Sequence, residues 1–397
     1  MKIAMILDSP YPPDPRVELE ARLLHEAGHE VILFVLQKQD ITGFVPPSFL
    51  KLHNKGVSKW EYLALGLIYT MPFAKSYLAR YIREFLEKVQ PDVVHVHDMR
   101  IAPAVVKAMS NMSVPMVLDL HENRPEIMKE YPTLQIWWKR MVIAPSRWAK
   151  AEKQLILQSR ATVVVTPEAK AHYMSELGLP ASHFVVVPNA VSRSFLKQAA
   201  AHESTFPQNS PFQFLYIGDT GMRRGLPEVF ESMRWLQEQG RLGNIRLCIL
   251  GKSSDDDKLK HMVKERHLEK VVEFAGWLPA EELHTFLAKS HAGLSPLRRN
   301  IHHDTTYPNK IFQYMAYGLP VIVSDCPSSA NVIHNCDTGI VYPALDKQAL
   351  AEAMELVATD SKKYQTWSNN GKAAFEGPLD PDKWVGELTK FYSALNV

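Results

Sequence analysis

The sequence predicts an α/β fold in which two Rossmann-like domains, each with a doubly wound parallel sheet, follow one another along the chain. Short continuous runs of valine, isoleucine and leucine alternate with helical patterns, and such runs are typical of parallel strands buried on both faces. The alternation stops at a polar stretch near residue 197 and then restarts. A length of 397 residues also suits two domains of about 100–200 residues each.

The first series of strands begins at the N-terminus. The apolar run KIAMIL predicts a strand at residues 2–7, and the helical spacing of apolar residues that follows it ends at Gly28. Helical segments separate the later strands, so the right-handed crossovers of a parallel sheet are expected. These later apolar runs predict strands at residues 31–36, 92–97, 115–120, 161–166 and 183–188.

A polar segment, KQAAAHESTFPQNSPF, starts at residue 197 and has no apolar period, which indicates a linker between domains. The final segment, DPDKWVGELTKFYSAL, predicts an amphipathic helix that crosses back to the first domain. We therefore expect an N-terminal domain at 1–196, a C-terminal domain at 197–375, and a returning helix within 376–397. Strands of the C-terminal domain are predicted at residues 212–218, 245–251, 271–276, 291–296, 320–325 and 339–344.

The composition is that of an ordinary globular protein, with 46% hydrophobic and 22% charged residues and a formal net charge of +2. We expect no nucleic-acid partner. Cys248, Cys326 and Cys336 have no CxxC spacing, which argues against a disulfide framework or a zinc knuckle and favours a reducing cytosol. The first apolar run is too short for a signal peptide, and no run approaches the roughly 20 apolar residues that span a bilayer. A cytoplasmic location is expected.

Two segments, residues 57–86 and 137–150, are rich in aromatic and apolar residues and studded with lysine and arginine. Amphipathic basic helices of this kind lie in membrane interfaces. The same pattern is produced by helices that face a core on one side and water on the other. The sequence leaves both interpretations open, so a peripheral contact with the inner face of a membrane is one expectation for residues 57–86.

Ligands of doubly wound sheets bind beyond the carboxyl ends of the strands, so the loops after each predicted strand are the candidate sites. The first such loop, residues 8–16, contains neither GxGxxG nor GxxxxGK[ST], which argues against a dinucleotide-binding dehydrogenase and a P-loop enzyme. Arg16 stands at a helix start, where it would reach an anionic group, or would form a surface salt bridge.

The strand at residues 115–120 is followed by His121 and Glu122, and a histidine at this place is a candidate contact to a sugar or a general acid or base. His95 and His97 share one face of their strand, as a metal-binding pair would. No third ligand is identifiable near them, and the adjacent His302 and His303 do not suit one ion. We therefore expect no metal.

The loop YIGDTGMRRGL, at residues 216–226, leads from a strand into a helix, so its glycines would let backbone amides approach an anion. Arg223 and Arg224 add guanidinium groups suited to a diphosphate. Further along, Asn309 is a plausible N-cap of a helix whose first turn would contain Lys310. A lysine is disfavoured at that end of a helix unless an anion is present, so this position also indicates a phosphate.

These residues and their order resemble the retaining glycosyltransferases of family 4, which have the GT-B fold, and the resemblance covers nearly the whole chain. It is carried by LLHEAGHEVILF, PDVVHVHD, the strand ending in DLHE, VVVTPEA with VVVPNAV, YIGDTGMRRG, VEFAGWLP and PNKIFQYMAYGLPVIVS. The resemblance implies two Rossmann-like domains facing a cleft, a nucleotide-sugar donor on the C-terminal domain and an acceptor on the N-terminal domain. It also implies that the sugar is transferred with retention, with no metal or other cofactor, and that basic residues stabilise the leaving diphosphate.

The resemblance assigns catalytic roles to His121 near the reacting sugar and to Arg224 and Lys310 at the diphosphate. Arg16 and Glu122 are placed on the acceptor side. It assigns donor binding to the glycine-rich loop, to the loop that frames the base, and to positions that hold the ribose and donor sugar: Gly218, Gly221, Arg223, Trp277, Leu278, Thr305, Asn309 and Gln313.

The chain departs from the family pattern at four places, and one of them is the loop after the first strand, which lacks the common glycine pair. Thr305 and Gln313 stand where the family has the two carboxylates of an E-x7-E motif, and Asp219 follows Gly218 where arginine is common. A glutamine can still hydrogen-bond a ribose hydroxyl. An inward-pointing Asp219 would repel a diphosphate, and Arg223, Arg298, Arg299 or Lys310 would then have to supply the missing positive charge.

The resulting hypothesis is a metal-independent, retaining glycosyltransferase that moves a sugar from a UDP- or GDP-sugar to a lipid-linked or soluble acceptor in cell-surface glycan synthesis. The altered carboxylates keep open a GT-B protein that binds or scaffolds without transferring. A nucleotide-sugar epimerase shares the fold and is a further alternative. It would need acid and base residues in the same cleft and no acceptor site.

Overall fold

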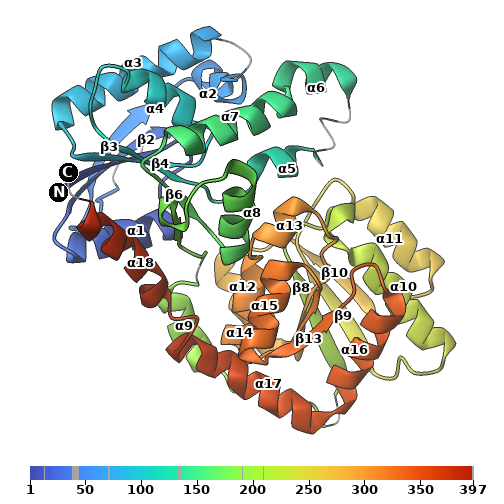
Figure 1. The fold of residues 1–397 in the computed structure, drawn as a ribbon. Helices are drawn as coiled ribbons and strands as arrows, with labels where there is room; N and C mark the ends of the chain where they lie inside the picture. Colours follow the sequence, from blue (N-terminus) through green and yellow to red (C-terminus); the bar gives the residue numbers. More distant parts are fainter. Residues whose placement is uncertain are drawn as a thin grey trace. The chain divides into compact units, whose positions relative to one another are not determined.

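The computed structural model describes residues 1–12, 14–37, 44–69, 72–129, 131, 134, 136–189, 191–208 and 210–395. The chain forms two compact units (Figure 1). The first contains residues 1–189 and 382–397, and the second contains residues 190–381. Each unit holds one parallel sheet with helices on both faces, so the predicted GT-B-type α/β architecture is confirmed.

The first sheet is entirely parallel and has the order β3-β2-β1-β4-β5-β6-β7. The chain reverses its direction of growth between β1 and β4, which makes this the point where ligands of such sheets bind. One strand, with the sequence KLHNKG, was not predicted because it is polar and lies at the sheet edge. The strands are β1 Lys2–Leu7, β2 Glu30–Gln37, β3 Lys51–Gly56, β4 Val93–His97, β5 Met116–Asp119, β6 Ala161–Val164 and β7 Phe184–Val186.

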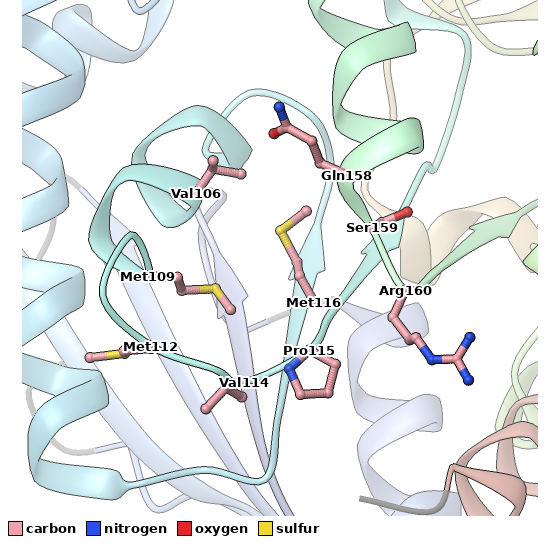
Figure 2. A pocket seen from close by; sticks show the side chains of 9 residues that line it. All are labelled: Val106, Met109, Met112, Val114, Pro115, Met116, Gln158, Ser159 and Arg160. Carbon is pink, nitrogen blue, oxygen red and sulfur yellow. The ribbon is translucent and has the colours of Figure 1, made fainter.

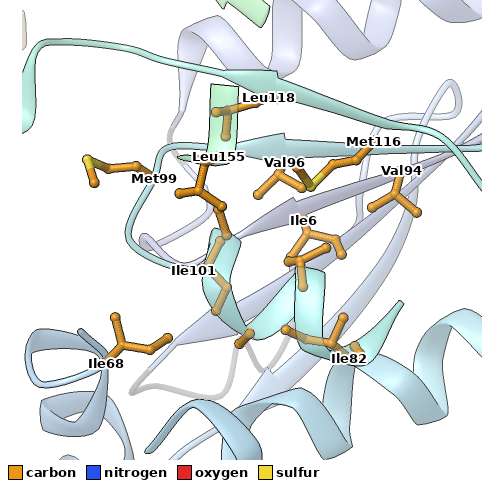
Figure 3. Packing of buried hydrophobic residues seen from close by; sticks show 14 of the residues in the cluster. Ile6, Ile68, Ile82, Val94, Val96, Met99, Ile101, Met116, Leu118 and Leu155 are labelled. Atoms are coloured by element: carbon orange, nitrogen blue, oxygen red, sulfur yellow. The ribbon is translucent and has the colours of Figure 1, made fainter. Parts of the chain in front are cut away.

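Alternating residues of these strands face two separate cores. Val94, Val96 and Leu118 pack against helices on one face, where Ile82 and Leu155 meet them (Figure 3). The helices of this unit are α1 Pro15–Glu26, α2 Lys59–Gly66, α3 Pro72–Val89, α4 Ala102–Ala108, α5 Arg124–Met128, α6 Trp137–Ile143, α7 Pro145–Gln158 and α8 Pro167–Leu177.

The other face of the first sheet is covered by α1 and by the last helix, α18 (Pro381–Ala394). Asp14 caps α1 by accepting a hydrogen bond from the amide of Val17. Leu388 and Tyr392 of α18 are fully buried in the same cluster as Val17 and the strands. The predicted return of the C-terminal helix to the first domain is therefore confirmed.

The second sheet is also entirely parallel and has the order β10-β9-β8-β11-β12-β13, the Rossmann arrangement. Its strands are β8 Phe212–Ile217, β9 Ile245–Leu250, β10 Val272–Gly276, β11 Ala292–Ser295, β12 Val321–Ser324 and β13 Gly339–Tyr342. Its helices are α9 Arg193–Ala200, α10 Leu226–Glu238, α11 Asp256–Glu265, α12 Ala280–Lys289, α13 Ile301–Thr305, α14 Asn309–Ala316, α15 Pro327–Cys336, α16 Lys347–Thr359 and α17 Ser361–Ala373.

The segment predicted as a linker begins in a helix. Residues 197–200 complete α9, which Ser192 caps by accepting a hydrogen bond from the amide of Phe195. The prediction failed there because only eight residues form this helix, and its apolar stripe is too short to recognise. Within the described residues, no helix is both long and apolar enough to cross a membrane.

Candidate active site

Polar side chains gather where β4 and β5 of the first unit end. His97 is the last residue of β4 and Asp119 the last of β5, and both side chains are fully buried. Nδ1 of His97 donates to Oδ2 of Asp119 over 3.1 Å, and Nε2 of His121 lies 3.0 Å from the same oxygen. One carboxylate therefore binds two imidazoles, and only that of His121, with 23% of its side chain exposed, reaches solvent.

The carboxylate of Asp119 controls the charge of His121. Burial opposes a charge on either side chain, but Arg16 and His121 outweigh it at Asp119 and hold the pKa of that carboxyl well below its ordinary value. At His121 burial is likewise outweighed, because Asp119 raises the pKa of the imidazole. The pair thus favours an imidazolium whose Nδ1 can donate to a ligand.

Arg16 lies inside the first unit, so the alternative of a surface salt bridge is wrong. Its guanidinium binds both oxygens of Asp119, at 2.7 and 3.2 Å, and lies 3.1 Å from Oε1 of Glu20. It also donates to the carbonyl of Val187 and the side chain of Asn189. These contacts make it the counter-ion of Asp119, and its role toward an acceptor stays a prediction.

A third and a fourth polar group join His95 and His97, contrary to the expectation that no further ligand is near. Glu20 on α1 and Asp119 on β5 offer oxygen atoms that lie within 4.8 Å of the histidine nitrogens. The sequence hid this group because Glu20 is distant in the chain and follows a helical pattern. Arg16 already neutralises part of the acidic charge, so this arrangement does not need a cation.

Glu122 and Asp98 flank His121 on the rim of this site. Asp98 pairs with Arg124, and Glu122 lies 3.5 Å from the same guanidinium. Arg124 lowers the pKa of Asp98 against the effect of burial. The rim is therefore an ordered ion-pair network, and the acceptor-side role of Glu122 stays a prediction.

In the second unit, the loop after β8 is organised by Asp219. Its carboxylate accepts hydrogen bonds from the amide of Gly221 at 3.0 Å and from Arg223 at 2.8 Å, and lies 3.4 Å from Nε of Arg224. Although burial opposes it, these groups lower the pKa of Asp219. Arg223 and Arg224 thus hold the carboxylate of Asp219, which in turn positions their guanidinium groups.

Two glycines allow this loop to approach its neighbours. At Gly225, φ is +83° and an added Cβ would lie 1.6 Å from the carbonyl oxygen of Pro296, in the loop after β11. At Gly251, after β9, an added Cβ would lie 1.8 Å from the carbonyl oxygen of Gly218. No side chain fits at either place, so the carboxyl ends of three strands come together.

Lys310 is buried in the first turn of α14, as predicted, with 8% of its surface exposed. The N-cap of this helix is Pro308, next to Asn309, which was predicted to lie at or close to the cap. Nζ lies 3.7 Å from the centre of the Tyr216 ring, and among the described residues no carboxylate pairs with it. Burial and then Arg224 lower the pKa of Lys310 well below its ordinary value. A bound anion would reverse this shift.

The other predicted donor residues lie at the same carboxyl edge. Thr305 donates its hydroxyl to the carbonyl of Ile301 over 2.6 Å. Asn309 is exposed and Gln313 half-buried, one turn apart on α14. Trp277, 71% exposed, and the half-buried Leu278 follow the end of β10.

Two family models together span most of this chain. The model of the glycosyl transferases group 1 matches residues 197–374, and that of Glycosyltransferase Family 4 matches residues 16–195. The chain belongs to the group 1 glycosyltransferases. The predicted family is confirmed, and with it the assignment to a family of transferase enzymes.

Two relatives show how far the likeness in sequence extends. Glycogen synthase of Mycobacterium tuberculosis is 22% identical over 271 residues, which are 68% of this chain and 61% of that protein. The match thus spans less than two thirds of the relative. An amylovoran biosynthesis glycosyltransferase of Erwinia amylovora is 28% identical over 144 residues, 36% of this chain and 35% of that one.

The fold likeness is more extensive. A solved structure from Escherichia coli, described as trehalose-6-phosphate bound with UDP-2-fluoro glucose, has a TM-score of 0.72 and 12% identity. The alignment covers 100% of this chain and 99% of that one. At this identity the likeness establishes the shared fold.

The hollow shown in Figure 2 lies elsewhere in this glycosyltransferase. It measures about 480 Å³ and is lined by methionines such as Met109 and Met116 and by Arg160. Met116 is the first residue of β5, whereas Asp119 is its last. The hollow is therefore at the amino edge of the sheet, away from the strand ends that carry the site.

Sequence reasoning missed the roles of four residues that shape the sites of this glycosyltransferase: Glu20, Asp119, Tyr216 and His303. Asp119 stood within an apolar run and looked like part of a core strand, although its i, i+2 spacing to His121 was a usable signal. Burial and Arg224 help to keep His303 neutral, with its pKa lowered to about 4, and its Nε2 lies 3.4 Å from Arg224.

Proposed function

We propose that this glycosyltransferase moves a sugar from a nucleoside diphosphate sugar to an acceptor hydroxyl, with retention of configuration and without a metal ion. The bond between the anomeric carbon and the diphosphate oxygen breaks, and its electron pair leaves with the diphosphate. The acceptor oxygen forms the new bond on the same face of the sugar. Its proton passes to the departing diphosphate.

The buried position of Lys310 at a helix start is the observation that supports this proposal most strongly. A lysine that is buried, lacks a carboxylate partner among the described residues and stands in the first turn of a helix is stabilised by a bound anion. Arg223 and Arg224 lie on the loop after β8, and Arg224 is close enough to Lys310 to lower its pKa. Three basic side chains at one strand edge suit a bound diphosphate and the further negative charge that develops on it as it leaves.

His121 has the second role in this proposal. With Nε2 bound to Asp119, its Nδ1 is the nitrogen left to hydrogen-bond a sugar hydroxyl. Its charge would make it a donor and strengthen that bond. We assign it to positioning the donor sugar or acceptor during transfer.

The substrates are proposed from the relatives and the donor edge. A structure of this fold holds a UDP-sugar, and the relatives make glycogen or amylovoran, so a UDP- or GDP-sugar and a growing glycan are proposed here. We propose that the reaction takes place in the cytoplasm.

A lipid-linked acceptor is favoured by exposed apolar residues of the first unit. Trp60 and Phe73, in residues 57–86, are 81% and 68% exposed, while Trp137 and Met141 are 72% and 70% exposed. The core-facing alternative also holds for part of this segment, because Leu78 is fully buried. The exposed residues would enter a membrane interface beside basic side chains.

Donor turnover in the presence of EDTA tests the proposal. The full-length protein is incubated with UDP- and GDP-sugars, water or an oligosaccharide serves as acceptor, and NMR records the first anomer released. Release of the nucleoside diphosphate with retained configuration is expected. Turnover only with magnesium, or an inverted product, would contradict it. Nucleotide binding without turnover would support the non-transferring alternative that the missing carboxylates at Thr305 and Gln313 favour.

A further inference from the structure

Four buried side chains behind His121 form a group that the proposed reaction does not use directly. We call Glu20, His95, His97 and Asp119 the buried cluster; all four are fully buried between α1, α18 and the ends of β4 and β5. Both carboxylate oxygens of Glu20 lack a hydrogen bond to the described residues, as does Nε2 of His95. Such groups are costly to bury unless charges and protons are arranged among them.

The geometry of the cluster connects Glu20 to His121 through shared neighbours. Oε2 of Glu20 lies 3.6 Å from Nε2 of His95, which is itself 3.8 Å from Oδ2 of Asp119. That oxygen binds His121 at 3.0 Å. Tyr392 on α18 lies 2.7 Å from Nδ1 of His95 and fixes the orientation of its ring.

The charges of the group balance when one of the neighbouring imidazoles is charged, and His121 is the one that reaches solvent. Asp119 and Glu20 can each carry a negative charge, and Arg16 supplies one positive charge to both. Burial and His95 lower the pKa of His97 to about 3, so His97 stays neutral. A protonated His121 brings the sum to zero, and a buried group with no net charge has the lowest desolvation cost.

We propose that Glu20 is a positioning residue for His121, and that its buried carboxylate acts with Asp119 to hold the imidazole of His121 in its charged form. The two residues share one proton: when Glu20 takes it up, His121 can release one and the group stays neutral. This inference rests on the proposed function only for the use of that charge in sugar transfer.

The surroundings support a shared proton near neutral pH. Burial and then Asp119 raise the pKa of Glu20 to about 7, while Arg16, His95 and His121 lower it. Burial lowers the pKa of His121, but Asp119 raises it by more. Arg16 also lowers this pKa, and Asp98 on the rim raises it. Glu20 therefore changes charge near neutral pH, where an enzyme operates, and the pKa of His121 lies above its ordinary value.

A bound divalent cation is the competing explanation for the unpartnered atoms. Bonds of about 2.0–2.2 Å in a tetrahedral site place neighbouring ligand atoms about 3.4 Å apart, close to the 3.1, 3.6 and 3.8 Å seen here. Arg16, however, binds Asp119 and Glu20 at hydrogen-bonding distance, so a cation would meet a buried guanidinium. The shared proton avoids this repulsion.

Titration of His121 tests the proposal directly. The full-length protein carries isotope-labelled histidine, its ring signals are followed from about pH 5 to pH 9, and His121→Gln identifies the signal. In Glu20→Gln the midpoint for His121 should fall by about one pH unit, the order expected when a nearby buried charge is removed. Glu18→Gln, on the exposed face of the same helix, should leave it unchanged. An unchanged midpoint in Glu20→Gln would overturn the proposal.

The wild-type protein provides the same test if Glu20→Gln does not fold. Carboxyl signals of labelled glutamate should show Glu20 titrating in the range of His121, each curve with two steps because the sites interact. A Glu20 carboxyl that ionises at an ordinary acidic pH would overturn the proposal. So would a stoichiometric divalent metal in the purified protein, measured by elemental analysis.

Activity separates this inference from the proposed function. The pH at which kcat/KM declines on the basic side should fall in Glu20→Gln by the same amount as the His121 midpoint. If the midpoint moves and the rate profile does not, the shared proton stands and the role of His121 in transfer fails. If neither moves, the inference itself fails.

Discussion

Nε2 of His121 and Oδ2 of Asp119 lie 3.0 Å apart at the carboxyl end of β5. Among the imidazoles of this site, only that of His121 reaches solvent. The carboxylate of Asp119 is held by Arg16, whose guanidinium lies 2.7 Å from Oδ1. The position and the charge of His121 are thus both set by a carboxylate that is itself inaccessible.

Asp119→Asn should lower kcat about 10²-fold or more, because general acid–base and charged hydrogen-bonding groups contribute about 10²–10⁴-fold when intact. The change also removes the negative charge that pairs with the buried guanidinium of Arg16. The free energy of unfolding should therefore fall by about 3 kcal/mol. Steady-state assays well below the unfolding transition, with circular dichroism as a check of the fold, measure both effects. An unchanged kcat would show that the pair has no part in turnover.

Lys310→Ala should reduce kcat/KM by about 10²-fold or more, the usual cost of losing a group that stabilises developing charge. Lys362→Ala, at an exposed position of α17, is the matched control and should behave like wild type. Initial rates over a range of donor concentrations measure the effect. A loss of less than twofold would remove Lys310 from the diphosphate site.

Gly225→Ala should destabilise the second unit by more than 2 kcal/mol and weaken nucleotide binding, because the new methyl group meets the carbonyl of Pro296. Gly240→Ala is the control: its φ is also positive, at +66°, but nothing lies within 4 Å of an added Cβ. It should cost only about 1 kcal/mol. Urea unfolding compares the two, and equal losses would mean that the contact with Pro296 is unimportant.

The contribution of Glu20 to stability should fall as the pH rises from about 4.5 to about 7. Glu20 has an ordinary pKa of 4.5, raised by burial to about 7 in the fold, so in this window the folded chain holds a proton that the unfolded chain releases. The raised pKa of His121 acts in the same direction at higher pH. The Glu20 shift is worth about 3 kcal/mol.

Glu20→Gln cannot release a proton and should lose this part of the pH dependence. Urea unfolding of both proteins at several pH values measures the slopes. Equal slopes would show that Glu20 ionises normally within the fold.

The strands could be predicted because continuous apolar runs report burial on both faces, as in residues 2–7 and 31–36. The polar edge strand Lys51–Gly56 lacks that signal. At the site, His121 and Lys310 were found from their places after a strand and in a helix turn. Glu20 was not, because its role arises from contacts with residues 75 or more positions away, such as His95 and Asp119.

A membrane contact should depend on the exposed aromatic residues of the first unit. Replacing Trp60 and Phe73 with serine should reduce co-flotation with anionic vesicles, because less apolar area can enter the interface. Leu157→Ser, at a 55% exposed position of α7, is the control. Flotation of the double variant equal to wild type would exclude this surface from lipid binding.

Binding of nucleotides in the presence of EDTA tests whether Lys310 belongs to a metal-free donor site. Thermal unfolding of the wild-type protein and of Lys310→Ala is measured with UDP, GDP, ADP and CMP. One diphosphate should stabilise the wild type by about 2.7 kcal/mol at 100 times its Kd, with the stabilisation largely lost in Lys310→Ala. Stabilisation by none of them, or only when magnesium is present, would contradict a metal-free donor site built on Lys310.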